Sequence, residues 1–386
     1  MPLIETLAAI LGLAILTVAT SYAVIALLAV LVWNRPRAAL NSPRLPPVTV
    51  LKPLCGAEPG LYANLRTFCV QNYPEYQIVF GVRDLDDPAL AVVRRLQTEF
   101  PALPIDVVIN PQIHGSNFKV SNLINMMAKA RHDVLTMADS DATVGSDYLR
   151  TVTAPLLDRR VGLVTSIYHD VPTKPIWSRL GAMYINEWYM PSVLLAWLFG
   201  HKGYVSGQTL CLRRDTLQAI GSLHTIANHL ADDHRLGELV DGLGLRIVLS
   251  PYLVRAEHHE PTWRSLTRHE LRWMRTIRLL RPRSFCLLFF SFSLPLAMLG
   301  LLLCALSPPV STAAWAIFLT AVGARLALHF VPRLHSDRPM LADLWLLPAH
   351  DLLIGWVWLR AFFTSRVTWR GSEFDLGADG VMRQRS

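Results

Sequence analysis

Residues Asp133–Val144 read DVLTMADSDATV, and the rest of the chain is organised around this stretch. Val134–Ala138 is short and apolar, as expected of a strand buried in a parallel sheet. The run stops at Asp139-Ser140-Asp141, where the carboxylates at i and i+2 can lie on one side of the chain. Two such oxygen ligands suit a hard divalent cation that holds a diphosphate. Taken alone, the same residues also suit a solvated turn.

The composition indicates a membrane protein. Of the 386 residues 52% are hydrophobic, and the mean hydropathy is +0.31. The net charge of +8 comes from local arginine clusters beside apolar stretches, which predicts the bilayer as a partner and not nucleic acid. Five cysteines without CxxC spacing predict neither disulfides nor a zinc site. The adjacent His258 and His259 are interpreted as structural or loop residues.

The N-terminal segment predicts a membrane anchor over residues 1–34. Thr6–Trp33 contains no charged residue and is long enough to span a bilayer. Arg35 and Arg37 follow at once, and such a basic flank favours the cytoplasmic side. The chain from residue 35 onward is therefore expected in the cytoplasm, which in a bacterium means the inner face of the inner membrane.

Three further apolar stretches predict membrane helices over residues 285–365. They are Phe285–Leu306, Ser311–Val331 and Met340–Phe363. Arg360, Arg366 and Arg370 resemble an inside flank before the tail over 366–386, so one of the last stretches is expected to be re-entrant. Before them, residues 263–284 repeat arginines at helical spacing, which predicts a helix lying on the inner leaflet.

A soluble domain is expected over 45–262, where strand and helix patterns alternate. Alternation of this kind predicts an α/β fold with a parallel-rich, doubly wound sheet and ligands at the carboxyl ends of its strands. The predicted strands are Val48–Leu51, Gln77–Val82, Ile105–Ile109, Val134–Ala138, Val161–Tyr168, Leu210–Arg213 and Leu245–Leu249. The predicted helices are Ala89–Phe100, Ser116–Ala130, a short one capped by Ser146, and His224–Val240. Pro175–Phe199 is rich in Trp and Tyr and suits either a core helix pair or a segment at the membrane interface.

Acidic residues occur in separate segments of this domain, at Asp87, Asp139 and Asp233. Asn117 and Lys119, just before the organising strand, are placed to help bind phosphate. A diphosphate leaving group needs a metal and positive charge, and an acceptor hydroxyl needs a base. The set therefore indicates a nucleotide-sugar enzyme. Each site also has an ordinary alternative: a helix N-cap at Asp87 and a solvated helix turn at Asp233.

Seven segments, in this order, make the chain resemble the ceramide glucosyltransferase family. They read VLKPLCGAEPGL, NYPEYQIVFGVRDLDDPA, HGSNFKVSNLINMM, DVLTMADSDATV, GQTLCLRRDTL, LADDHRL and HELRW. The similarity covers roughly residues 45–370 and extends to the layout of one N-terminal span and a C-terminal cluster. It implies a membrane-bound, inverting glycosyltransferase with a GT-A fold. The group also includes bacterial hopanoid-lipid glycosyltransferases.

The resemblance implies roles for the acidic residues. Asp87 matches the first family aspartate, which helps bind the nucleotide, and Asp139 matches the second, at the metal and diphosphate. Asp141 completes the DxD where some members carry Gly. Asp233 matches the third aspartate, the general base.

The resemblance also covers the basic helix. His269, Arg272 and Trp273 match the (Q/R)xxRW element at the diphosphate and acceptor side, with His in place of Gln or Arg. In isolation, Arg272-Trp273 could equally be a snorkelling Arg and an interface Trp. Where the animal enzymes carry His-Pro, this chain has Met190-Pro191, so a different acceptor pocket is expected.

The expected reaction moves glucose or N-acetylglucosamine from a UDP-sugar to the hydroxyl of a membrane lipid, ceramide or a hopanoid polyol. The product is a β-glycolipid, and the expected cofactor is Mg²⁺ or Mn²⁺ held by Asp139 and Asp141. One alternative is a processive polysaccharide synthase, against which the few C-terminal stretches argue. Another is a nucleotide-sugar or lipid binding protein without activity, against which the intact acidic set argues.

Overall fold

The computed structural model describes residues 2–34, 45–201, 203–306, 310–335, 339–369, 372–377 and 379–384. The chain forms two compact units. Unit 1 comprises Met1–Pro36, Pro172–Gly200 and Glu260–Thr368, and unit 2 comprises Arg37–Val171, His201–His259 and Trp369–Ser386. Residues 172–200, which the sequence suggested as part of a continuous 45–262 domain, therefore group with the apolar helices of unit 1.

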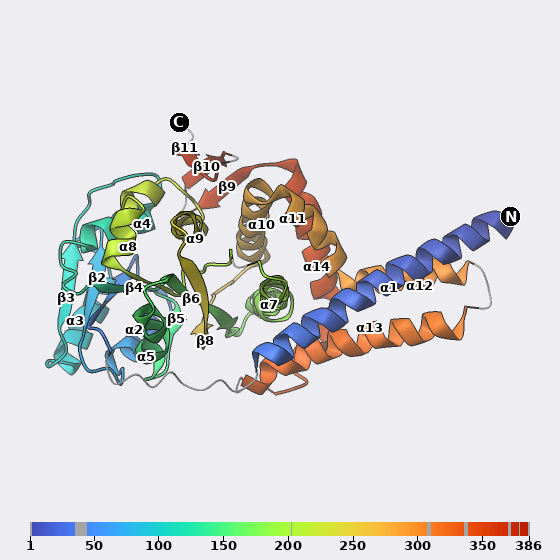
Figure 1. The fold of residues 1–386 in the computed structure, drawn as a ribbon, viewed down its shortest axis with the longest axis horizontal. Helices are drawn as coiled ribbons and strands as arrows, with labels where there is room; N and C mark the ends of the chain where they lie inside the picture. Colours follow the sequence, from blue (N-terminus) through green and yellow to red (C-terminus); the bar gives the residue numbers. More distant parts are fainter. Residues whose placement is uncertain are drawn as a thin grey trace. The chain divides into compact units, whose positions relative to one another are not determined.

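Unit 2 is built on an eight-stranded mixed sheet with the order β3-β2-β1-β4-β7-β6-β8-β5 (Figure 1). Its strands are β1 (Val48–Pro53), β2 (Tyr76–Val82), β3 (Ile105–Ile109), β4 (Val134–Met137), β5 (Ala142–Thr143), β6 (Val161–Asp170), β7 (Leu210–Arg213) and β8 (Arg246–Ala256). β1 pairs in parallel with β2 and β4, and β2 with β3, whereas β7 runs antiparallel to β4 and β6. The predicted parallel-rich sheet is confirmed, and the carboxyl ends of β1, β2 and β4 share one edge.

The central strands are buried along their whole length. Every residue of β1, β4 and β6 is buried, as expected of strands covered on both faces. The helices that accompany the sheet are α2 (Leu61–Cys69), α3 (Ala89–Glu99), α4 (Phe118–Met126), α5 (Tyr148–Thr153), α8 (Arg214–Ala219) and α9 (Asp232–Gly242). The core between them includes Leu51, Leu135 and Leu210 from the sheet with Leu123 and Leu236 from α4 and α9.

Two helix starts differ from the sequence prediction. α5 begins after Asp147 and not after Ser146, because the Asp147 carbonyl accepts the hydrogen bond from the Thr151 N–H at 3.0 Å. α9 begins at Asp232, well after the predicted His224. The intervening backbone is held by the C-terminal tail, where the Leu230 N–H donates to the carbonyl of residue 380 at 3.1 Å. In that tail β10 (Ser372–Leu376) and β11 (Met382–Gln384) pair antiparallel.

Unit 1 is helical. Its elements are α1 (Pro2–Trp33), α6 (Ile176–Met183), a π-helix (Tyr184–Tyr189), α7 (Met190–Leu198), α10 (Trp263–Leu280), α11 (Pro282–Leu287), α12 (Ser293–Ala305), α13 (Thr312–Phe330) and α14 (Leu347–Arg360). α1 and α12 approach closely through glycines. A Cβ on Gly12 would lie 2.6 Å from the Gly300 carbonyl oxygen, and one on Gly300 would lie 2.7 Å from that of Gly12. Small residues permit this backbone contact between apolar helices.

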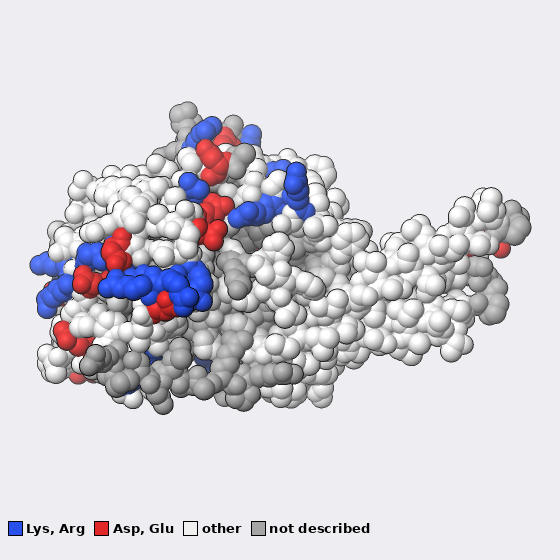
Figure 2. Space-filling model, in the orientation of Figure 1, with Lys and Arg blue, Asp and Glu red and all other residues white. Residues whose placement is uncertain are grey.

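Three described helical segments are long and apolar enough to cross a membrane: Leu3–Trp33, Thr312–Leu334 and Leu344–Phe363. Residues 282–291 and 293–305 form a pair bent by 61°, so the break falls in the first C-terminal stretch and not in a later one. Figure 2 shows almost no charged side chain over α1, α12 and α13, whereas cationic side chains lie over α10 and α11. This distribution matches the predicted apolar spans and basic helix.

Candidate active site

The organising strand β4 delivers Asp139 to the carboxyl edge of the sheet in unit 2. Asp139 Oδ1 lies 2.6 Å from the Lys119 Nζ, which extends from the first turn of α4. The same ammonium group lies 3.5 Å from Asp232 Oδ2 at the start of α9. Asn117, the N-cap of α4, donates from Nδ2 to Asp232 Oδ1 at 3.3 Å. The predicted Asn117, Lys119 and Asp139 therefore form one contiguous cluster with α9.

Asp139 and Asp233 meet at a glycine that the sequence analysis did not single out, Gly207. The Gly207 N–H donates to Asp233 Oδ2 at 3.0 Å, and the Asp139 N–H donates to the Gly207 carbonyl at 3.2 Å. A Cβ on Gly207 would lie only 2.7 Å from Asp139 Oδ2 and 2.8 Å from the Lys119 Nζ. Any larger residue would displace these groups. Gly207 opens the segment GQTLCLRRDTL, so a signal for it was present.

The Asp141 carboxylate is contacted by His258, whose other ring nitrogen contacts Asp170. His258 Nε2 lies 3.3 Å from Asp141 Oδ2, and His258 Nδ1 lies 3.0 Å from Asp170 Oδ1, a side chain only 1% exposed. Gln208 Nε2 donates to Asp141 Oδ1 at 3.1 Å. His258 lies in the loop after β8, in keeping with its interpretation as a structural or loop residue, and from there it joins Asp170, the last residue of β6, to the DxD segment.

A second lysine lies beneath the DxD segment. Lys52, near the end of β1, is fully buried, and its Nζ donates to the Asp139 carbonyl at 2.5 Å. The Nζ also lies 3.8 Å from the centroid of the Phe68 ring. Burial lowers the pKa of Lys52 to about 7, against the opposing attraction of Asp141 and Asp139. The sequence analysis missed this residue because it stands at the end of an apolar strand pattern.

Burial and neighbouring charge give the carboxyl groups different proton affinities. Burial raises the pKa of Asp139, but Lys119 outweighs it and leaves that pKa below its usual value. Burial raises the pKa of Asp232 to about 6, against the opposing effect of Lys119. Burial also raises the pKa values of Asp141 and Asp233. Asp139 thus stays ionised beside its ammonium partner, whereas Asp233 is a stronger base than an ordinary aspartate, as proton abstraction requires.

Asp87 organises the loops at the same edge of the sheet. Its carboxylate accepts two hydrogen bonds from the Gly56 N–H, at 3.0 and 3.1 Å, and one from the Ala89 N–H at 2.9 Å. It therefore ties the loop after β1 to the start of α3. Among the described contacts none joins Asp87 directly to Asp139. Because Asp87 follows β2, its position is compatible both with a role at the start of α3 and with a place near the site.

His269, Arg272 and Trp273 form a cluster of their own in unit 1, on α10. His269 Nδ1 lies 2.7 Å from Glu260 Oε1, and the His269 and Trp273 ring centroids are 4.2 Å apart. The Arg272 guanidinium carbon lies 5.9 Å from the centroid of the Trp273 ring. Trp273 also stacks on Tyr184, with ring centroids 5.6 Å apart. The predicted (Q/R)xxRW element is therefore packed within a group of aromatic rings.

A buried carboxyl lies beside this group. Glu270 is 2% exposed, and within the described residues neither of its carboxyl oxygens has a hydrogen-bond partner. Burial raises the pKa of Glu270 well above its usual value, and the neighbouring Glu260 adds to the effect. The sequence analysis took no note of Glu270, because only the packing of α10 shows that it faces inward.

The donor set of Asp139 and Asp141 suits Mg²⁺ or Mn²⁺, because both ions prefer carboxylate oxygen. Within the described ranges no cluster of at least three His, Cys, Asp or Glu side chains is arranged to hold a metal. An ion bound by these two aspartates would therefore take its other ligands from water or from the oxygens of a bound molecule. Mg²⁺ commonly binds in this way at phosphate sites.

Comparison with known families gives one match over most of the chain. The sequence profile described as Glycosyl transferase family 21 matches residues 10–382. Among curated proteins, Ceramide glucosyltransferase 1 of Caenorhabditis elegans is 23% identical over 211 residues, which cover 54% of this chain and 45% of that protein. The Ceramide glucosyltransferase of Candida albicans is 27% identical over 144 residues, covering 32% of this chain and 26% of that protein. The matched part thus spans less than half the length of these relatives.

A solved structure shares the fold. The mannosyltransferase PcManGT from Pyrobaculum calidifontis, in complex with GDP-Man and Mn²⁺, superposes with a TM-score of 0.52 at 17% identity. The match covers 92% of this chain and 97% of that one. The expected GT-A fold, with an apolar N-terminal helix and apolar C-terminal helices, is therefore confirmed.

Proposed function

The chain belongs to glycosyl transferase family 21, and we propose that it transfers a single hexose from a UDP-sugar to the hydroxyl of a membrane lipid with inversion. The observation that carries the proposal is the meeting of Asp139, Lys119 and Asp233 around Gly207. An anion-binding ammonium group and a carboxylate of raised pKa then lie side by side at the carboxyl edge of an α/β sheet. Ligands of open α/β sheets bind at this edge.

On the donor side, Lys119 and Asn117 lie at the start of α4, where the positive end of the helix and the Lys119 ammonium group favour a diphosphate. A Mg²⁺ or Mn²⁺ ion held by Asp139 and Asp141 would offset the negative charge of the leaving UDP. Asp87 orders the loop that approaches the nucleotide, through its bonds to Gly56. The mannosyltransferase of the same fold was solved with a nucleotide sugar and Mn²⁺, which supports this arrangement.

On the acceptor side, Asp233 takes the proton from the lipid hydroxyl as the oxygen attacks the anomeric carbon. The bond to the diphosphate breaks in the same step, so an α-linked donor gives a β-glycoside and no covalent enzyme intermediate forms. The Gly207 and His234 N–H groups, at 3.0 and 2.7 Å from the Asp233 oxygens, hold this carboxylate in place. His269, Arg272 and Trp273 are proposed to act at the diphosphate and acceptor side.

Two relatives named ceramide glucosyltransferases make ceramide the first acceptor to examine. A hopanoid polyol, which only the resemblance in the sequence suggests, is the second. The cytoplasmic leaflet is the proposed site of reaction, because Arg35 and Arg37 follow the first span. The proposed product carries one sugar per lipid, and a polymer is the alternative that the following test distinguishes.

The test is transfer of labelled sugar by the full-length protein in lipid nanodiscs. UDP-glucose and UDP-N-acetylglucosamine are each supplied with ceramide or a hopanoid polyol, and the lipid products are identified by mass spectrometry. We expect one sugar per lipid, in a linkage that a β-glucosidase cleaves for glucose or a β-N-acetylglucosaminidase cleaves for N-acetylglucosamine. A long polymer would replace this proposal with a polysaccharide synthase, and no release of UDP with any acceptor would reject the enzyme.

Removal of divalent ions is expected to lower sugar transfer by about a hundredfold or more, because the metal carries several kcal/mol of charge stabilisation at the diphosphate. Activity is measured after treatment with EDTA and again after adding back Mg²⁺ or Mn²⁺. The Asp141→Asn variant should need a higher metal concentration for half-maximal activity. Full activity in EDTA would contradict a metal at Asp139 and Asp141.

A further inference from the structure

In unit 1, two basic segments that are distant in the sequence lie together. Residues 271–284 and 352–368 contain between them Arg272, Arg275, Arg278, Arg281, Arg283, Arg360 and Arg366. Neither segment contains an Asp or a Glu. The helix α10 packs against α14 and against the turn Ala361–Phe363 that follows it (Figure 1). The fold therefore gathers positive charge where these helices meet.

Three of these arginines, Arg275, Arg278 and Arg360, are here called the arginine cluster. Arg275 Nη1 donates to the Arg366 carbonyl at 2.6 Å, and Arg278 Nη2 donates to the Thr364 carbonyl at 3.4 Å. Arg360 stands four residues before Thr364, in the last turn of α14. The backbone after α14 thus holds two guanidinium groups of α10 near the third.

The charge of the cluster is not neutralised by the protein. Among the described residues, none of the three guanidinium groups is paired with a carboxylate. The buried Nε atoms of Arg275 and Arg278 have no hydrogen-bond partner in the same ranges. The two backbone carbonyls orient the guanidinium groups, but carbonyls are neutral. Burial lowers the pKa of Arg275, and the neighbouring Arg360 and Arg278 lower it further, so its surroundings oppose its charge.

Stabilisation of helix ends is the ordinary role for such residues, and it accounts for part of the cluster. Arg278 and Arg360 stand in the last turns of α10 and α14. The C-terminus of a helix is equivalent to about −0.5 elementary charge, so the two ends offset about one of the three positive charges. About two charges remain, and Arg275 lies further inside its helix. The helix ends alone therefore do not explain the cluster.

The cluster lies near the end of a candidate membrane span. Arg360 belongs to the last part of Leu344–Phe363, which is long and apolar enough to cross a membrane. The Arg360 guanidinium carbon lies 5.7 Å from the centroid of the Trp356 ring. Arginine and tryptophan side chains near the end of a span commonly lie at the level of the lipid headgroups. Lipid phosphates are therefore the anions available at this depth.

We propose that the arginine cluster binds the phosphate group of an anionic phospholipid, which supplies the negative charge that the protein lacks there. Guanidinium groups bind phosphate through paired N–H donors, and each arginine of the cluster keeps donors beyond those that bond to carbonyls. The lipid is a component of the surrounding membrane and not the sugar acceptor. The site is thus independent of the proposed transfer.

The net charge of the headgroup selects among phospholipids. Phosphatidylcholine has a trimethylammonium group beside its phosphate and would bring another positive charge to the cluster. Phosphatidylglycerol has no such cation, so its binding lowers the net charge. A free phosphate offers the same oxygens but has no acyl chain to cover the apolar surface around Arg360, where Leu359 and Phe363 are 53% and 75% exposed. An anionic lipid satisfies both the charge and the apolar surface.

The test is thermal unfolding of the full-length protein in a neutral detergent, titrated separately with short-chain phosphatidylglycerol, short-chain phosphatidylcholine and inorganic phosphate. A ligand that binds only the folded state raises the unfolding temperature. We expect this effect from phosphatidylglycerol alone. Arg360→Gln, at an exposed position, should raise the concentration of phosphatidylglycerol for half of the effect by about fivefold. Arg264→Gln removes the same charge from an exposed position at the start of α10 and should leave that concentration unchanged.

Charge reversal at the same two positions gives a second comparison. Arg360→Glu places a carboxylate where the cluster has none. Without lipid, this variant should unfold at the same temperature as the unmodified protein or at a higher one, because the new carboxylate faces like charges that repel one another. It should also lose the response to phosphatidylglycerol. Arg264→Glu, its control, should keep that response.

Four results would overturn the site. An equal response to inorganic phosphate means that the cluster binds a free anion, and an equal response to phosphatidylcholine means that charge does not select the lipid. An effect of Arg264→Gln as large as that of Arg360→Gln means that α10 is a diffuse basic surface. A lower unfolding temperature of lipid-free Arg360→Glu means that the protein already neutralises the cluster. None of these measurements involves sugar transfer, so failure of the proposed function leaves the site standing.

Discussion

Replacing Asp233 by Asn is expected to abolish sugar transfer while leaving UDP binding largely intact. Asn keeps the size of the side chain, but its single amide oxygen can accept from only one of the Gly207 and His234 N–H groups, and it cannot take a proton at neutral pH. Loss of a general base costs about 10²- to 10⁴-fold in rate. The measurement is kcat for transfer, with UDP affinity determined by calorimetry on the same preparation.

The control for this variant is Asp241→Asn, at an exposed position near the end of the same helix, α9. It should retain activity, because the side chain lies away from Gly207. Burial raises the pKa of Asp233, so activity of the unmodified protein should fall on the acid side at a higher pH than an ordinary aspartate would give. Normal turnover in Asp233→Asn would refute the assignment of the base.

Local patterns in the sequence predicted most of the sheet. The strands Ile105–Ile109 and Leu210–Arg213 have the predicted bounds, because short apolar runs rich in branched residues are closed by turn residues. Helix starts were less accurate where distant segments intervene. α9 begins late because its preceding residues bond to the C-terminal tail, a contact that no local pattern contains.

The same distinction holds for the site. Asp139 stood out because two carboxylates close an apolar strand, and the family resemblance added Asp233. Their meeting at Gly207 depends on the antiparallel pairing of β4 with β7, which follows only from the assembled sheet. Lys52 was missed, and the contact of His258 with Asp141 was not anticipated, for the same reason: each reaches the DxD segment from a distant part of the chain.

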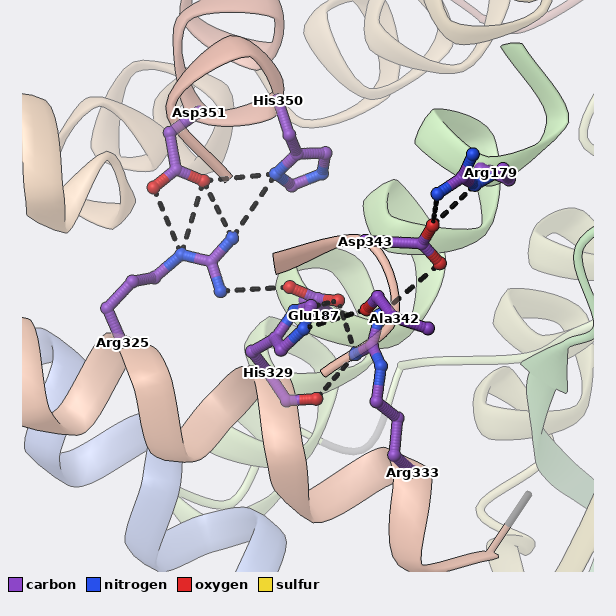
Figure 3. A network of polar contacts seen from close by, with 9 residues as sticks. All are labelled: Arg179, Glu187, Arg325, His329, Arg333, Ala342, Asp343, His350 and Asp351. Carbon is purple, nitrogen blue, oxygen red and sulfur yellow. Dashed lines mark hydrogen bonds and ion pairs between the residues drawn. The ribbon is translucent and has the colours of Figure 1, made fainter. Parts of the chain in front are cut away.

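A buried row of ion pairs in unit 1, the ion-pair ladder, shows the limit of sequence-based prediction most clearly (Figure 3). It runs Asp351–Arg325–Glu187–Arg333–Asp343–Arg179. Arg325 and Asp351 stand in apolar stretches, where charge is costly, so each is expected from the sequence to face a neighbouring helix. Glu187, the second carboxylate that pairs with Arg325, stands in a different segment of the chain among aromatic residues. Alternation of charge along the row is a property of the packed helices, so residue spacing alone gave no indication of it.

Arg325→Met is expected to destabilise the folded protein by about 3–5 kcal/mol, the usual cost of removing one partner from a buried ion pair. The change leaves Asp351 with only His350 among its described ladder contacts and takes one of the guanidinium groups from Glu187. Thermal unfolding in detergent, followed by the loss of monodisperse protein, measures the effect. Arg159→Met is the control, since its pair with Asp215 is 79% and 60% exposed, and such pairs contribute about 0–1 kcal/mol.

The double variant Arg325→Met with Asp351→Leu separates the pairing from the packing. If the loss in Arg325→Met comes from an uncompensated carboxylate, removing that carboxylate as well should restore part of the stability, although Glu187 still lacks one partner. If the lost stability comes only from the missing volume of the arginine side chain, Asp351→Leu should lower the stability further. If Arg325→Met and Arg159→Met unfold at the same temperature, the buried ion pairs of Arg325 do not stabilise the protein. An arginine that neutralises two buried carboxylates could not be replaced by methionine without a loss of stability.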